Sequence, residues 1–176
     1  MAKKKGFTLV EMLIVVSILG LLLPAFFAIV YGLFRQQIQL INLQKVKEGG
    51  DFSRRIITNT IRNNAVEIIS DCSGASLPAT TTKICFKDGA GYLFGYFITS
   101  EATPRLASYS AVLVDPVYLV DTTSSFPMVI PETPPAVFSK IDSNTVQFVY
   151  DIQSVPKVDY LVPQKMSYQF YVNLHK

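Results

Sequence analysis

Residues 1–34 read MAKKKGFTLVEMLIVVSILGLLLPAFFAIVYGLF, a lysine-rich start followed by a long apolar run. No charged residue occurs from Met12 to Phe34. A helix of that length extends roughly 35 Å, which is enough to cross a hydrocarbon layer of about 30 Å. Three lysines precede the run and one arginine follows it, so the N-terminus is expected on the cytoplasmic side. We therefore predict a membrane-spanning helix, with the rest of the chain outside.

A cleaved secretory signal is the main competing interpretation of this run. Such signals have an apolar core of about 7–15 residues that ends at a small-residue cleavage site. Here the apolar core is longer, and Phe34-Arg35 offers no such site. We therefore expect the helix to be retained.

Glu11 is the acidic residue at the start of this apolar stretch. A carboxylate near the membrane interface can reach the headgroups and have no further role, which is the simplest interpretation. If several such helices packed together, however, the carboxylate would lose its water and would need a cation. The chain has no lysine or arginine between Glu11 and Arg35. A free α-amino group a few residues upstream would supply that charge.

Residues 6–11, GFTLVE, follow a lysine-rich leader and begin an apolar helix, and this arrangement resembles the class III signal of type IV pilins and pseudopilins. The resemblance implies that a membrane peptidase cuts between Gly6 and Phe7 and methylates the new N-terminus at Phe7. It also implies that Glu11 pairs with the N-terminal amine of a neighbouring subunit as helices bundle into a filament. Setting register is the best-attested use of a buried polar group in a helix bundle.

The same resemblance implies partners and a location. The partners would be other pilin or pseudopilin subunits, a prepilin peptidase and methyltransferase, and an assembly platform in the inner membrane. The chain would begin as a single-pass protein of the cytoplasmic membrane and end in an extracellular or periplasmic filament. Its organisation is similar to that of minor, J-type or W-type subunits at filament tips, and a major pilin is the alternative within the family.

The charge balance argues against nucleic acid as a general partner. The chain has 16 basic and 13 acidic residues, and loss of the three leader lysines would leave 13 of each. A neutral chain has no overall basic field with which to attract phosphates. A local basic patch around Arg54, Arg55 and Arg62 remains, and we interpret it as the solvated face of a helix.

Residues 35–70 have apolar side chains three and four positions apart, which is typical of an amphipathic helix. Pro24 is expected to kink or loosen the preceding membrane half. Gly49-Gly50 is expected to interrupt the second half, with Asp51 capping a restart. We expect one long, bent helix whose second half offers an apolar stripe to a globular domain. The predicted stripe comprises Ile38, Ile41, Val46, Phe52, Ile56, Ile57, Ile61, Ala65 and Ile68.

From residue 71 onward the pattern changes to short strands. The last one alternates apolar and polar side chains, which is typical of an antiparallel strand with one face on a core. We therefore predict an α+β fold in which the long N-terminal helix packs on an antiparallel meander. The predicted organisation is a leader (1–6), a membrane helix (7–34), an amphipathic helix (35–70) and a β-rich domain (71–176). The candidate strands are Lys83–Phe86, Gly91–Thr99, Ala111–Val120, Thr145–Ile152 and Met166–Leu174.

Cys72 and Cys85 are the two cysteines of the chain. In an exported domain we expect them to form a disulfide that ties the helix end to the first strand, with two free buried thiols as the alternative. We expect no metal site, because these cysteines and His175 are too few ligands.

Catalytic motifs are absent from the sequence, which has no GxxxxGK[ST], GxSxG, CxxC or HExxH pattern. The sole histidine, His175, is next to the last residue, where a base would be poorly held. We therefore predict no catalytic residues, no cofactor and no enzymatic activity. The alternative from another class is a single-pass, membrane-anchored exported domain that binds a ligand through its loops and does not polymerise.

Overall fold

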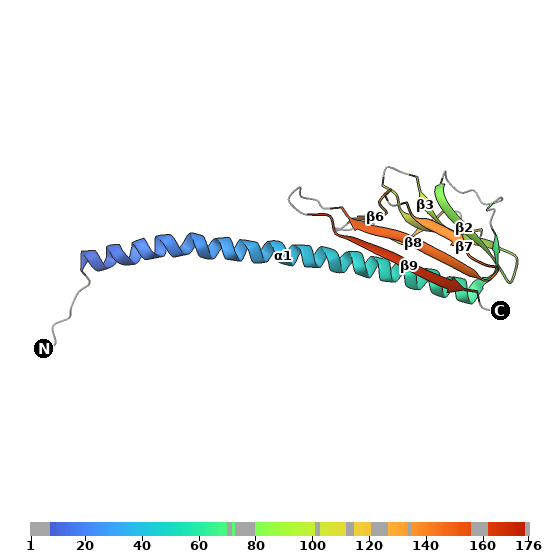
Figure 1. Ribbon diagram of the computed structural model, residues 1–176, viewed down its shortest axis with the longest axis horizontal. Helices are drawn as coiled ribbons and strands as arrows, with labels where there is room; N and C mark the ends of the chain where they lie inside the picture. Colours follow the sequence, from blue (N-terminus) through green and yellow to red (C-terminus); the bar gives the residue numbers. More distant parts are fainter. Residues whose placement is uncertain are drawn as a thin grey trace. The chain divides into compact units, whose positions relative to one another are not determined.

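The computed structural model describes residues 8–69, 72, 80–100, 103–111, 115–120, 127–133, 135–155 and 162–174. Within these ranges one α-helix, α1 (Leu9–Asn64), is followed by nine β-strands (Figure 1). The chain divides into two compact units, Met1–Leu40 and Ile41–Lys176. The first holds the apolar part of α1, and the second holds the rest of α1 together with all the strands.

The apolar part of α1 has no covered face within its own unit. Every side chain from Leu9 to Ile29 is exposed, although most of them are large and apolar. By length and composition this helix can cross a membrane. Pro24 lies inside α1 and does not end it. A helix that is apolar all round requires lipid or other helices as its surroundings.

The first sheet of the second unit is an antiparallel meander in the order β1-β2-β3-β4-β5, which confirms the predicted meander. Its first strand corrects the sequence analysis, because residues 65–69 were expected to end the helix. The sequence AVEII of this segment is rich in β-branched side chains, which favour a strand, and it pairs with β2. The strands are β1 (Ala65–Ile69), β2 (Thr80–Asp88), β3 (Leu93–Thr99), β4 (Leu106–Ser110) and β5 (Val117–Tyr118).

A second antiparallel sheet is built around β8, whereas the sequence analysis expected a single sheet. Strand β9 pairs with β8 from Thr145↔Asn173 to Gln153↔Lys165, and β7 and β6 pair with the other edge of β8. The Thr82 hydroxyl of β2 donates a 3.0 Å hydrogen bond to the Ala136 carbonyl next to β7, which ties the two sheets together. The strands are β6 (Met128–Val129), β7 (Val137–Lys140), β8 (Thr145–Ser154) and β9 (Lys165–Asn173).

The candidate strands at 83–86, 91–99, 145–152 and 166–174 overlap β2, β3, β8 and β9. The candidate Ala111–Val120 was wrong, because β4 ends at Ser110 and only the two-residue β5 falls within the described part of that range. Pro116, directly before β5, has no N–H to give to a sheet ladder. Strands β4, β6 and β7 were not predicted.

The second part of α1 packs on the inner face of β8 and β9, and Figure 1 shows these strands beside it. The sheet contributes an aromatic ladder in which Phe148 stacks on Phe170 at 5.3 Å and Tyr150 stacks on Tyr168 at 5.7 Å between ring centroids. Three residues of the predicted packing stripe are exposed instead, namely Ile38 (36%), Ile41 (47%) and Phe52 (54%). The buried helix residues follow a spacing of three and four and are Asn42, Val46, Gly50, Ser53, Ile57 and Ile61.

The pair Gly49-Gly50 corrects another expectation, because it lies inside α1 and does not interrupt it. The ring of Tyr168 lies directly over Gly50, and any Cβ there would overlap the ring. The Tyr168 hydroxyl donates a 3.1 Å hydrogen bond to the Lys47 carbonyl oxygen. The sheet approaches the helix so closely here that only a residue without a side chain fits, which explains the glycine at position 50.

Ser53 completes this close contact one turn further along α1. Its side chain is fully buried, and its hydroxyl bonds the Gly50 carbonyl and the Tyr150 hydroxyl, each at 2.9 Å. Burial raises the pKa of the Tyr150 phenol, which therefore stays neutral and available for this bond. The small residues at 50 and 53 let two tyrosine rings lie against the helix backbone with their polar ends satisfied.

The predicted disulfide is present between Cys72 and Cys85. Cys85 points to the face of the first sheet opposite the core residues Ile84 and Phe86, because consecutive strand residues alternate between faces. Gly95 is its partner in β3, where a side chain would overlap the Ile84 backbone carbonyl and also crowd the Cys85 sulfur. The bridge therefore ties the segment after β1 to the outer face of this sheet.

Substituting Gly50→Ala is expected to lower the free energy of unfolding of the second unit by about 1–3 kcal/mol, because the new methyl group displaces the Tyr168 ring. Gly49→Ala is the matched control. Its methyl group meets only the flexible end of Met128 at 2.9 Å, and the gain in helix propensity of up to about 1 kcal/mol offsets that contact. Urea unfolding of the full-length chain in detergent measures both, and equal stability of the two variants would contradict the close-approach argument.

Replacing both cysteines, as Cys72→Ala with Cys85→Ala, is expected to reduce the free energy of unfolding by about 3 kcal/mol, because the closed loop no longer restricts the unfolded chain. The same urea titration measures the loss. A reducing agent should destabilise the natural chain to a similar extent and leave the double variant unchanged. An unchanged midpoint for the double variant would show that the bridge does not stabilise the fold.

Candidate functional site

The first turn of α1 joins Glu11 to Thr8. The Thr8 amide donates to Glu11 Oε2 at 2.8 Å, and the Thr8 hydroxyl donates to the same oxygen at 3.0 Å. The Glu11 amide donates back to Thr8 Oγ1 at 3.3 Å. The Thr8 carbonyl accepts the first helical hydrogen bond, from Met12. This reciprocal pattern is a capping box, which satisfies amide groups that a helix start otherwise leaves without partners.

The capping box was missed in the sequence analysis, although its signal was present. A threonine three residues before a glutamate, just ahead of an apolar run, is the signature of this motif. Glu11 therefore has a role within its own chain, in addition to the one that the resemblance implies. A carboxylate in the first turn is also favoured by the helix dipole.

The two oxygens of Glu11 are used unequally. Both bonds from Thr8 end on Oε2, and Oε1 accepts none from the part of the chain that the structure describes. The side chain is exposed. One carboxylate oxygen thus holds the helix cap while the other faces outward, where a cation could bind without breaking the cap.

The predicted cleavage and methylation positions, Gly6 and Phe7, lie outside the described residues, so their roles remain predictions. Glu11 lies where the sequence analysis placed it, at the start of the apolar helix. The cysteines are not part of this site, since they belong to the second unit.

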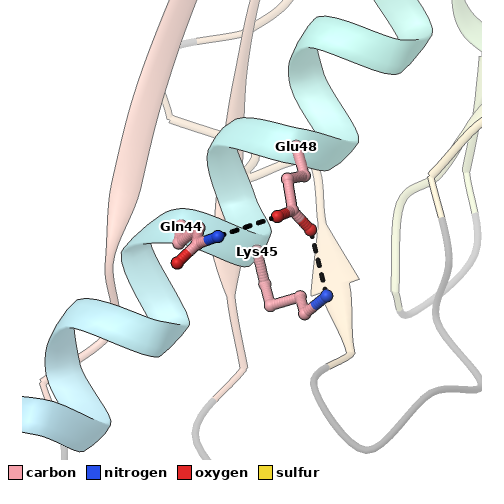
Figure 2. A network of polar contacts seen from close by, with 3 residues as sticks. All are labelled: Gln44, Lys45 and Glu48. Atoms are coloured by element: carbon pink, nitrogen blue, oxygen red, sulfur yellow. Dashed lines mark hydrogen bonds and ion pairs between the residues drawn. The ribbon is translucent and has the colours of Figure 1, made fainter.

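The surface of α1 after the apolar part carries a self-contained polar network, which Figure 2 shows. The Gln44 amide donates to Glu48 Oε1, and the Lys45 ammonium group contacts Glu48 Oε2, each at 3.0 Å. Lys45 and then Gln44 lower the pKa of the Glu48 carboxyl. Because all three side chains are exposed, the network contributes little to stability, but it compensates the charge of Lys45 within the helix surface.

Two turns further along, the helix surface has a different character. Between α1 and β9 lies a groove of about 390 Å³. The Arg54 guanidinium lies 5.6 Å from the centre of the Phe170 ring, within the range of a cation–π contact. Arg54, Arg55 and Arg62 are exposed, as the sequence analysis expected, but they also line this groove. Its complete lining is Asp51, Arg54, Arg55, Thr58, Asn59, Arg62, Phe170 and Tyr171.

A second hollow, of about 440 Å³, lies where the end of β3 meets the proline-rich segment around Pro131 and Pro135. Its titratable lining residue is Glu132. Across the ranges that the structure describes, no three His, Cys, Asp or Glu side chains gather to hold a metal ion. Burial raises the pKa of Tyr96 to about 12, so this phenol stays neutral within the core.

Comparison with protein families gave a match for residues 1–23 to the prokaryotic N-terminal methylation motif. The matched segment contains the predicted cleavage position Gly6-Phe7, the capping box, and much of the apolar part of α1. Comparison with curated proteins and with solved structures gave no match. The chain therefore carries a class III prepilin signal at the start of a pilin-like α+β fold.

Proposed function

We propose that this protein is a structural subunit of a type IV pilus or pseudopilus, cleaved after Gly6, methylated at Phe7 and assembled through its N-terminal helix. The observation that carries the proposal is the methylation motif at residues 1–23, which leads directly into a helix with no covered face. The role that this motif implies is structural and involves no catalysis by the chain itself.

The apolar part of α1 explains why such a subunit moves between two environments. Each exposed Leu, Ile or Phe would cost about 1.5–3 kcal/mol in water. Lipid covers these side chains before assembly, and the helices of neighbouring subunits cover them in the filament. Extraction from the membrane is driven by an ATP-dependent machine made of other proteins, and the folded second unit stays outside the membrane throughout.

Glu11 provides the polar element of the assembly step. As helices bundle, its carboxylate leaves the interface and loses water, so it needs a cation. The methylated amine of a neighbouring Phe7 supplies that cation at Oε1, while Oε2 keeps its bonds to Thr8. The pair forms at one axial position only, which sets the register between adjacent subunits.

Within the family we favour a minor subunit of a tip or priming complex. The disulfide joins the segment after β1 to β2, whereas the disulfide of a major pilin often closes a C-terminal loop. The partners are other pilin or pseudopilin subunits, the prepilin peptidase and methyltransferase, and the inner-membrane assembly platform. The subunit begins in the cytoplasmic membrane with its N-terminus inside and ends in an extracellular or periplasmic filament.

Two substitutions at Glu11 separate capping from charge pairing. Glu11→Ala removes both functions and is expected to reduce incorporation into filaments while leaving membrane insertion intact. Glu11→Gln keeps an oxygen that accepts hydrogen bonds from Thr8, but it has no negative charge to form an ion pair with a protonated amine. This variant is therefore expected to fail in assembly like the alanine variant. Incorporation is measured by immunoblotting sheared filaments from the natural host, with the membrane fraction as the control.

Normal assembly of Glu11→Gln together with failure of Glu11→Ala would show that capping alone matters, and would contradict the charge-pairing role. Normal assembly of both variants would remove Glu11 from the mechanism altogether.

A further inference from the structure

Strand β9 has a strand neighbour on one side only. It pairs with β8 along its whole length, and within the described ranges no strand pairs with its other edge. The groove described above touches both Phe170 and Tyr171. Consecutive strand residues point to opposite faces, so a groove that reaches both of them lies at the edge of the strand. An unpaired edge next to a groove is a template for an added strand.

The groove also holds positive charge without a matching negative partner. Arg54, Arg55 and Arg62 make no ion pair with the residues that the structure describes, whereas Lys45 and Lys165 pair with Glu48 and Asp151 at 3.0 and 2.7 Å. The sole acidic residue in the lining is Asp51, at the end of the groove away from Arg62. Asp51 lies one helical turn from Arg55 and three turns from Arg62, so the lining has three guanidinium groups against one carboxylate, and the excess of positive charge is greatest at Arg62.

Arg55 and Arg62 are seven positions apart on α1, so their side chains lie on one face of the helix. Thr58 and Asn59 lie between them and add polar groups along the same line. A guanidinium group binds carboxylate or phosphate through paired hydrogen bonds. The balance of 13 basic and 13 acidic residues outside the leader gives no general field for a polyphosphate. Because the positive charge is confined to these arginines on an otherwise neutral chain, the groove favours individual carboxylates over a polyphosphate as its ligands.

We propose that this groove binds an extended, carboxylate-bearing segment of a neighbouring filament subunit. The segment runs along the free edge of β9, where backbone hydrogen bonds hold it, and its acidic side chains pair with Arg55 and Arg62. The inference rests on the proposed function, since it assigns the partner to the same filament.

The test uses the full-length chain in its natural host, with the photo-reactive amino acid benzoylphenylalanine in place of Asn59, which is exposed and lines the groove. After irradiation, mass spectrometry identifies the attached peptide. The expected adduct is a peptide of a second subunit with an N-terminal methylation motif, carrying at least two carboxylates. In an Arg55→Glu, Arg62→Glu background the adduct is expected to fall at least about tenfold, because both charge pairs become repulsive.

The matched control is Lys83→Glu with Lys87→Glu, which makes the same change of charge on exposed positions of β2 and should leave the yield within about twofold. Arg55→Gln with Arg62→Gln should give an intermediate yield, and resistance to limited proteolysis reports that each variant has folded. An equal loss of adduct in the lysine control and in the Arg55→Glu, Arg62→Glu variant would overturn the proposal.

Processing is followed in the same samples, so that the two proposals fail separately. Methylated Phe7 in sheared filaments, together with no adduct, would overturn the groove assignment and leave the filament role intact. An adduct to nucleic acid, to a segment without carboxylates, or to a protein that is not a subunit of the filament would also overturn it. A chain that keeps its leader would overturn the filament role itself, and with it the partner named here.

Discussion

The apolar part of α1 has to be covered by something outside its own unit, and the proposed function follows from that requirement. Leu9 to Ile29 expose apolar side chains on every side of the helix. No globular partner within the unit removes them from water, so lipid or neighbouring helices must do so. The Glu11 carboxylate at the start of this helix has two uses. Its Oε2 accepts two hydrogen bonds from Thr8 and caps the helix, while its Oε1 is left for a partner from outside the chain.

In the second unit, a β-rich domain packs closely on the second part of the same helix. Gly50 and Ser53 remove bulk where Tyr168 and Tyr150 arrive, and both phenols end on helix or serine oxygens. A helix with larger residues at these positions would hold the sheet further away and would leave those hydroxyls without partners. The glycine pair that weakens the helix locally therefore strengthens its packing, and tertiary contact outweighs a propensity cost of about 1 kcal/mol per glycine.

Features with a local and periodic signal could be predicted from the sequence. The long helix, the meander, β8, β9 and the disulfide follow from hydropathy, alternation and cysteine usage. Features that depend on a distant contact could not be predicted: Gly50 meets Tyr168 more than a hundred positions away, which no local pattern records. The helix was extended over 65–69 because Ala65 and Ile68 fit its period, while pairing with β2 decided otherwise. Of the site, Glu11 was found from its chemistry, and the spacing of Thr8 and Glu11 also carried the signal for its cap, which was overlooked. The groove beside β9 depends on geometry that spacing alone does not give.

The proposed register, partner and location all depend on one step, the processing of the N-terminus as a prepilin. Mass spectrometry of the N-terminal peptide of protein purified from its own host shows whether that step occurs. We expect a chain that begins at Phe7 and carries one methyl group on its α-amine. An intact terminus at Met1 or Ala2 would contradict it, and would leave the lysine leader as a topology signal and the protein as an anchored exported domain.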